Sequence, residues 1–269
     1  MQTVEDKWQS IDLRSNEFAK RMERGLRPAP GSSLAKDDEL TDPGQISHTI
    51  ARLFAVSVDS LLTVTAVRLG ANVSPTYGSY TLVRTVFEAA GTGLWLLSGT
   101  VDRNERIRRS LQYDRQDCYD EAKTLDTLHR LRKGRGQGTT DLPDRNAKKT
   151  ECRDQLREVA GRRAIDPGTF EGRLVISSVL TEVGNEYGFP SLILAWQMCS
   201  AHAHGRRWAF LNTLNLEVIS EAGEGVVTIR ATSDPEKIVD LVTQACALVG
   251  LLLQAFDKRA TNHTPANAS

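Results

Sequence analysis

Hydrophobic residues recur at helical spacing along most of this chain. Between residues 46 and 69, apolar side chains keep the three- and four-residue spacing of a helix with one buried face, and Gly70 marks its end. Residues 3–24 show the same amphipathic pattern, with Trp8 and Phe18 on the apolar stripe. The pattern therefore predicts a mainly helical protein.

The same spacing predicts most of the remaining elements. It predicts further helices over residues 77–98, 102–131, 144–160, 170–186, 191–203 and from 234 onwards. The second half of the last helix is apolar nearly all round, which is typical of a central core helix. Two alternating runs around a glycine-rich turn predict a β-hairpin at about 213–232. The predicted fold class is all-α: a bundle of seven or eight helices with one small β-hairpin before the last helix.

Composition divides the chain into an arm, a linker, one large domain and a tail. Residues 1–24 are the predicted N-terminal helical arm, which docks on the body or on another subunit. Residues 25–45 are rich in proline, glycine and charge, and they predict a linker. Residues 46–258 form the predicted helical domain, and residues 259–269 a disordered tail.

Charge, cysteine usage and hydropathy restrict the class of protein. The 269 residues carry a formal net charge of zero, so there is no global electrostatic argument for a nucleic acid or a membrane surface. The four cysteines are far apart and contain no pair at metal-binding spacing, which argues against a zinc knuckle or a disulfide scaffold. The longest apolar run is about 12 residues, whereas a spanning helix needs about 20. We expect a cytoplasmic protein with free thiols and no membrane partner.

Arg84 and Glu88 form the most conspicuous candidate site, because they lie one turn apart in an otherwise mostly apolar helix. An exposed pair at this spacing gives only about 0.2 to 0.5 kcal/mol, so burial demands further partners from other helices. One interpretation is a core ion pair that fixes helix register. The other is a polar pocket, in which Arg84 binds an anion and Glu88 orients a histidine.

Two histidines near the end of an apolar helix form the second candidate. His202 and His204 point to different sides of a helix, so they do not ligate one metal ion together, and we predict no metal or other cofactor. The simplest interpretation places one histidine in the core and the other as a cation at the helix end. The alternative makes His204, beside Gly205, a general acid or base near neutral pH.

A local excess of basic residues is the third candidate. Residues 101–163 contain 17 basic and 12 acidic residues, and Arg130, Arg132 and Lys133 precede a glycine-rich loop. These side chains are candidates for contacts with phosphates. The alternative is a solvated helix end, where basic residues are common.

The order of these motifs resembles a known group of proteins. Arg84, Glu88 and Trp95 on an apolar helix, followed late in the chain by His204 and Gly205, resemble uncharacterised bacterial all-helical proteins allied to the HEPN superfamily. The resemblance spans residues 46–256. It implies a helical bundle, a homodimer and a metal-independent ribonuclease of a toxin or defence system. The superfamily's hallmark, an arginine followed by four to six residues and a histidine, is absent, so its catalytic pair is not carried over.

The leading hypothesis is therefore an RNA-directed protein that cleaves RNA without a metal ion. Arg84 would hold a phosphate, Glu88 would orient the site and His204 would act as acid or base. The predicted substrate-binding residues are Arg130, Arg132, Lys133, Trp95 and Trp196. One rival is a non-catalytic helical module that binds a protein partner. Another is a small-molecule enzyme with a buried polar pocket around Arg84 and Glu88.

Overall fold

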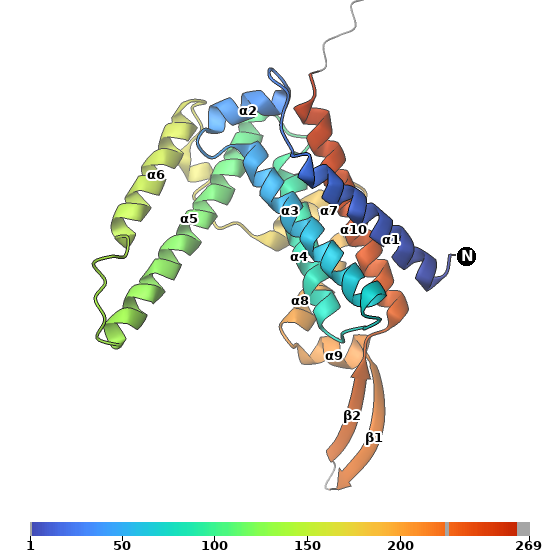
Figure 1. Ribbon diagram of the computed structural model, residues 1–269. Coiled ribbons are helices and arrows are strands. Elements are labelled where there is room, and N and C mark those ends of the chain that lie inside the picture. The colour runs from blue at the N-terminus through green and yellow to red at the C-terminus, as the bar shows by residue number, and fades with distance from the viewer. Residues whose placement is uncertain (1, 224–225, 263–269) are drawn as a thin grey trace, which may run out of the picture. The chain divides into compact units, whose positions relative to one another are not determined.

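The computed structural model describes residues 2–223 and 226–262 and is mostly helical (Figure 1). The elements are α1 (Val4–Glu23), α2 (Ser33–Thr41), α3 (Ile46–Thr65), α4 (Gly78–Leu96), α5 (Arg103–Gly134), α6 (Arg145–Gly161), α7 (Ile176–Glu186), α8 (Leu192–Ala203), α9 (Arg207–Thr213), β1 (Asn215–Gly223), β2 (Val226–Thr232) and α10 (Pro235–Ala260). A π-helical turn, Ala66–Gly70, follows α3, and a 3-10 turn, Pro167–Thr169, precedes α7. The predicted fold class, with a hairpin before the last helix, is confirmed.

The predicted number of seven or eight helices was too low, since the described residues contain ten α-helices. The two that were not expected, α2 and α9, have only nine and seven residues. Such short segments show too few turns for a clear apolar periodicity. The helix α2 lies inside the segment 25–45 that was predicted to be a linker. Of the predicted tail, residues 259 and 260 belong to α10, and residues 263–269 lie outside the described part of the chain.

The described residues divide into two compact units, each assembled from separate stretches of chain. Unit 1 comprises residues 2–27, 49–97 and 176–258, apart from the gap at 224–225, and unit 2 comprises residues 28–48, 98–175 and 259–262. The predicted domain 46–258 coincides with neither unit, because the insertion of residues 98–175 separates α4 from α7.

Unit 1 is built around α4, most of whose side chains are buried. Its glycines allow close approach of other helices. A Cβ atom at Gly91 would lie 2.3 Å from the side chain of Leu180 on α7, and one at Gly93 would lie 2.8 Å from Leu252 on α10. Leu248, Val249, Leu252 and Phe256 in the apolar half of α10 are fully buried, in agreement with the predicted core helix.

The N-terminal helix α1 docks on unit 1 of its own chain, where it lies alongside α3 and α10 (Figure 1). Trp8 is only 2% exposed, and the ring of Phe18 meets that of Phe54 edge to face with centroids 6.1 Å apart. Lys7 Nζ lies 2.7 Å from Asp240 Oδ1 at the margin of this contact. The predicted arm is therefore part of the hydrophobic core of unit 1.

The hairpin β1–β2 has one apolar and one polar face, and both are exposed. Val218 pairs with Ile229 across the strands and shares its face, and Val218 is 60% exposed. The opposite face carries the ion pair between Glu217 Oε2 and Arg230 Nη1, at 3.2 Å. The hairpin follows α9 directly and projects beyond the helices of unit 1 (Figure 1).

Two helical segments, Ile46–Gly70 and Pro235–Ala260, are long and apolar enough to cross a membrane by length and composition. The longest uninterrupted apolar run in the sequence, about 12 residues, did not predict segments of this length. About half of each segment, 50% and 56% of its most apolar stretch, is buried inside the protein. Core helices of soluble proteins satisfy the same criterion, so the two segments are weak evidence for a membrane.

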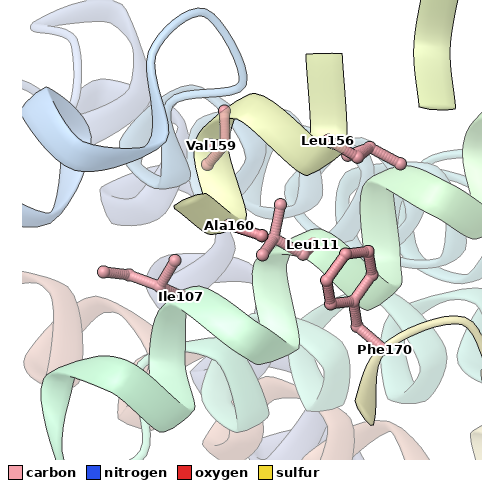
Figure 2. Packing of buried hydrophobic residues seen from close by; sticks show 6 residues of the cluster. All are labelled: Ile107, Leu111, Leu156, Val159, Ala160 and Phe170. Carbon is pink, nitrogen blue, oxygen red and sulfur yellow. The ribbon is translucent and has the colours of Figure 1, made fainter. Parts of the chain in front are cut away.

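Unit 2 is dominated by the antiparallel pair α5 and α6. Their packed ends share a small core, in which the side chains of both helices meet Phe170 from the following loop (Figure 2). The buried members of this core are Ile107, Leu111, Leu156, Val159, Ala160 and Phe170. Beyond it, towards the loop that joins the helices, few side chains are buried.

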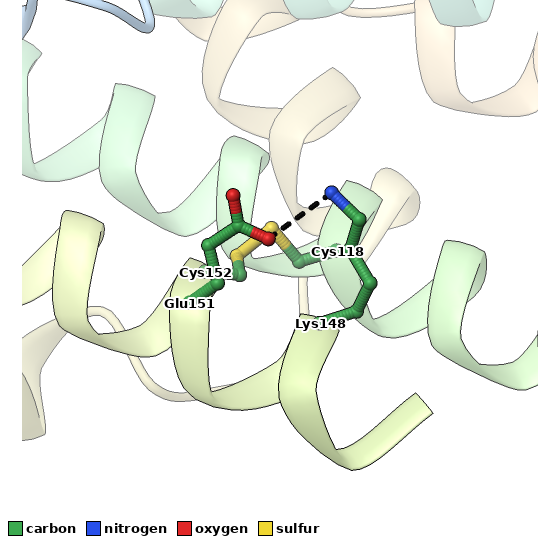
Figure 3. Close-up of a disulfide and its surroundings, with 4 residues drawn as sticks. All are labelled: Cys118, Lys148, Glu151 and Cys152. Carbon is green, nitrogen blue, oxygen red and sulfur yellow. Dashed lines mark ion pairs between the residues drawn. A yellow bond between two sulfur atoms is a disulfide. The ribbon is translucent and has the colours of Figure 1, made fainter. Parts of the chain in front are cut away.

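A disulfide joins the two helices where this core ends. Cys118 of α5 is bonded to Cys152 of α6, beside the ion pair between Lys148 and Glu151 (Figure 3). The expectation of four free thiols was therefore wrong for these two cysteines, because pairing of helices brings together residues 34 positions apart. Cys199 and Cys246 are free and buried.

Buried ion pairs hold α2 against α5. The carboxylate of Asp37, 1% exposed, accepts hydrogen bonds from Arg103 Nε at 2.6 Å and from Arg106 Nε at 2.9 Å. The neighbouring Asp38 accepts a hydrogen bond from the backbone N–H of Ser47 at 2.9 Å, while its burial raises its pKa. Acidic residues that suggested a solvated linker thus anchor a helix.

Candidate functional site

Arg84 and Glu88 form an ion pair on α4, with Arg84 Nε 2.8 Å from Glu88 Oε1. Their side chains are 27% and 29% exposed, so the pair lies at the edge of unit 1 and not in a dry interior. The sequence correctly paired the two residues but overestimated their burial. An ion pair with this much exposure is screened by water and contributes at most about 1 kcal/mol.

Two tryptophans extend the polar contacts of α4 to its neighbours. Trp196 of α8 donates its indole N–H to Glu88 Oε1 at 2.8 Å. Trp95, one turn beyond Gly91, donates to Glu182 Oε2 of α7 at 2.9 Å. Both predicted tryptophans therefore donate hydrogen bonds to carboxylates, and the acceptor of Trp196 is Glu88 of the predicted ion pair. These contacts fix the positions of α7 and α8 on α4, which agrees with the structural interpretation of the pair.

His202 is the histidine that faces the core. Its side chain is enclosed in unit 1, where its ring stacks on Tyr80 with centroids 3.9 Å apart and an angle of 21° between planes. Burial lowers the pKa of His202 below its usual 6.5, and it raises the pKa of Tyr80 to about 12. Both rings are thus neutral near pH 7.

The hydrogen bonds of Thr213 define the tautomer of His202. The Thr213 hydroxyl donates to the carbonyl of Ala209 at 2.7 Å and lies 2.6 Å from His202 Nε2. Because a hydroxyl has one proton, it accepts from His202, and Nε2 carries the ring proton. Nδ1 of His202 and the Tyr80 hydroxyl are buried without a partner among the described residues.

His204, the predicted acid or base, follows the last residue of α8 and is exposed. It lies eight residues beyond Trp196, which corresponds to about 12 Å along the helix axis. Within the described part of the chain, no hydrogen bond or ion pair links His204 to Arg84 or Glu88. The structure therefore brings together Arg84, Glu88 and Trp196, but it does not connect the imidazole of His204 to them.

Of the predicted phosphate-binding residues at the end of α5, Arg132 and Arg130 lie near carboxylates, and Lys133 is exposed to solvent. Arg132 Nη1 contacts both carboxylate oxygens of Asp141 at 2.7 Å, and this hydrogen bond lowers the pKa of Asp141. Arg130 lies 4.0 Å from Asp126, and Lys133 is exposed on the last turn. This arrangement is a solvated helix end.

A pocket of about 300 Å³ lies along the contact between α5 and α6 in unit 2. Its lining residues are Arg115, Cys118, Tyr119, Lys149, Cys152, Arg153, Leu156, Arg157, Phe170 and Glu171. Buried Leu156 and Phe170 and the disulfide give the pocket apolar surface, and exposed Tyr119 stands at its edge. The volume falls at the lower end of the range for small-molecule sites.

Four cations and one carboxylate line this pocket, so it is electropositive. Arg157 Nη2 lies 3.7 Å from Glu171, and Arg153 Nε lies 3.4 Å from its chain neighbour Asp154. Lys149 and Arg115 have no ion-pair partner among the described residues. The pocket can therefore receive an anion without first breaking a strong ion pair.

The prediction from sequence did not single out these residues, although the sequence contains a signal for them. Lys149, Arg153 and Arg157 recur every four residues, which places three cations on one face of α6. In the sequence, the cations of α6 were counted only as part of the basic surplus over residues 101–163. Arg115 and Tyr119 show the same spacing on α5.

Within residues 2–223 and 226–262, no group of three or more His, Cys, Asp or Glu side chains is placed to hold a metal ion. Comparison of the chain with protein-family models, curated proteins and solved structures found no match.

Proposed function

We propose that this chain is an RNA-directed protein whose unit 2 binds RNA through the cations of α5 and α6. The observation that carries the proposal is the electropositive pocket, which is lined by four cations, Arg115, Lys149, Arg153 and Arg157, and by a single carboxylate. The surplus of five basic residues over 101–163 points in the same direction. The resemblance of the motifs to HEPN-allied proteins favours RNA over other polyanions as the ligand of this pocket.

The distribution of ion pairs supports a local phosphate-binding surface and not a general one. Many cations of unit 2 are neutralised by nearby carboxylates, as Arg103 and Arg106 are by Asp37. The cations of the pocket are paired weakly or not at all: Arg115 and Lys149 have no ion-pair partner among the described residues, and the contacts of Arg153 and Arg157 with carboxylates measure 3.4 and 3.7 Å. Contacts of cations with phosphates release counterions, so RNA binding by this surface depends strongly on salt.

The test compares two double variants that remove the same charge from different places. Lys149→Gln with Arg153→Gln neutralises the pocket, whereas Arg130→Gln with Lys133→Gln neutralises the exposed end of α5. We expect the first to weaken binding of a labelled RNA and to reduce the slope of log affinity against log salt by about 1.4, since each single-stranded contact contributes about 0.7. The second should leave both quantities near the wild-type values.

The proposal fails if the wild-type protein does not bind RNA at low salt. It also fails if the two double variants lose affinity equally, because binding would then reflect total charge. Circular dichroism and thermal melting of each variant verify that unit 2 stays folded.

A further inference from the structure

The pocket of unit 2 combines features that single phosphate-binding surfaces do not need. Besides its four cations it has an aromatic side chain, Tyr119, and apolar surface from Leu156, Phe170 and the disulfide. A phosphate alone would require only the cations. The combination of an aromatic ring, apolar surface and positive charge matches a nucleotide, which has a flat aromatic base and an anionic phosphate.

Tyr119 is placed to stack on a base. Its side chain is 51% exposed, and Arg115 Cζ lies 6.0 Å from the centroid of its ring. The guanidinium supports the ring by a cation–π contact, while about half of the tyrosine stays accessible. Stacking of bases on aromatic side chains is tolerant of sequence, because every base has a π-face.

The cations of α6 lie in the same pocket as this ring. Lys149 and Arg153 are exposed, are separated by one helical turn and line the pocket together with Tyr119. The disulfide between Cys118 and Cys152 ties α5 to α6 at this level (Figure 3). Tyr119 directly follows Cys118 in the sequence. The bond therefore holds the aromatic residue of one helix beside the cations of the other.

We infer that this pocket takes up one nucleotide of single-stranded RNA, with the base against Tyr119 and the phosphate near Lys149 and Arg153. The inference rests on the proposed function and deepens it. A base within a duplex has both faces covered by its neighbours and is not available to the ring. The pocket therefore selects single-stranded over double-stranded RNA.

The decisive variant is Tyr119→Leu, which removes the ring but retains an apolar side chain. We expect its affinity for a short single-stranded RNA to fall about 5- to 150-fold, the range of one lost base–aromatic stack. Tyr119→Phe should bind as the wild type does, since it preserves the π-face. Tyr77→Leu in unit 1 is the matched control, because that tyrosine is similarly exposed, at 43%, and lies outside the pocket.

Competition with adenosine monophosphate tests occupation of the pocket directly. The mononucleotide should displace single-stranded RNA from the wild-type protein, and it should bind Tyr119→Leu more weakly, whereas inorganic phosphate should bind both equally. The inference is overturned if Tyr119→Leu binds single-stranded RNA like the wild type while the Lys149 and Arg153 double variant does not. That result would leave the proposed function standing, whereas absence of RNA binding by the wild type would remove both.

Discussion

At the scale of single residues, the buried ring of His202 ties the stability of unit 1 to pH. Its pKa is lowered below 6.5 by burial, so the unfolded state binds a proton at a higher pH than the folded state does. The stabilising effect is fully present above pH 6.5 and is lost as the pH falls below that value. We predict that the free energy of unfolding decreases on acidification by at most about 1.4 kcal/mol per pH unit from this group.

Urea unfolding between about pH 7.5 and about pH 5 measures this effect. His202→Asn keeps a polar side chain near Thr213 but does not titrate, so its stability should depend less on pH over this range. His129→Asn is the control in unit 2, where Nε2 of the ring contacts the carbonyl of Pro143. An equal pH dependence in His202→Asn and the wild type would show that His202 is not buried as a neutral base.

Individual residues were predictable where the cause is local. The close approach at Gly91 and Gly93 follows from missing side chains on one helix, and the Arg84–Glu88 contact follows from their spacing. The partner of Glu88 was not predictable as a contact, because Trp196 is 108 residues away and only the packing of α8 on α4 brings it near. The pocket could not be predicted for the same reason, because the side chains that line it come from two different helices.

At the scale of elements, amphipathic periodicity and capping residues set the long helices. The capping box of Thr3 and Asp6 starts α1, and Asp102 accepts the N–H of Glu105 to start α5. The short helix α2 depends instead on contacts with residues that are distant in the sequence. Asp37 anchors it through Arg103 and Arg106, which lie more than 60 residues away, so no local window reveals the contact.

The disulfide gives a prediction about the α5–α6 pair. Cys118→Ser with Cys152→Ser should lower the stability of unit 2 by roughly 2 to 4 kcal/mol, the usual effect of removing a loop-closing disulfide. The loop it closes spans 34 residues, and the distal halves of both helices have little other apolar packing. A dithiol reductant should destabilise the wild type to the same extent and leave the double variant unchanged.

Alkylation of the denatured, unreduced protein counts the thiols independently. Labelling of Cys199 and Cys246 alone is expected, since these two are the free cysteines. Labelling of all four cysteines in protein purified without reductant would contradict the disulfide.

At the scale of the whole molecule, the chain leaves unit 1 after α4 and returns to it at α7. Helical periodicity reports which face of a segment is buried but not which partner covers it. Residues 102–160 therefore looked like a continuation of one bundle, although α5 and α6 bury their apolar side chains against each other. The two units also separate the candidate sites: Arg84, Glu88 and His204 belong to unit 1, and the pocket belongs to unit 2.

That separation makes RNA cleavage testable independently of RNA binding. The resemblance to HEPN-allied proteins predicts degradation of single-stranded RNA in the presence of EDTA, with loss of activity in Arg84→Gln and His204→Ala. His129→Ala, in unit 2, should retain activity, and both unit 1 variants should still bind RNA through the pocket. Because no hydrogen bond among the described residues orients His204, cleavage requires His204 and Arg84 each to reach the same bound RNA. Intact RNA after prolonged incubation with a protein that binds it would show that unit 2 acts by binding alone, and that Arg84 and Glu88 serve to hold α8 on α4.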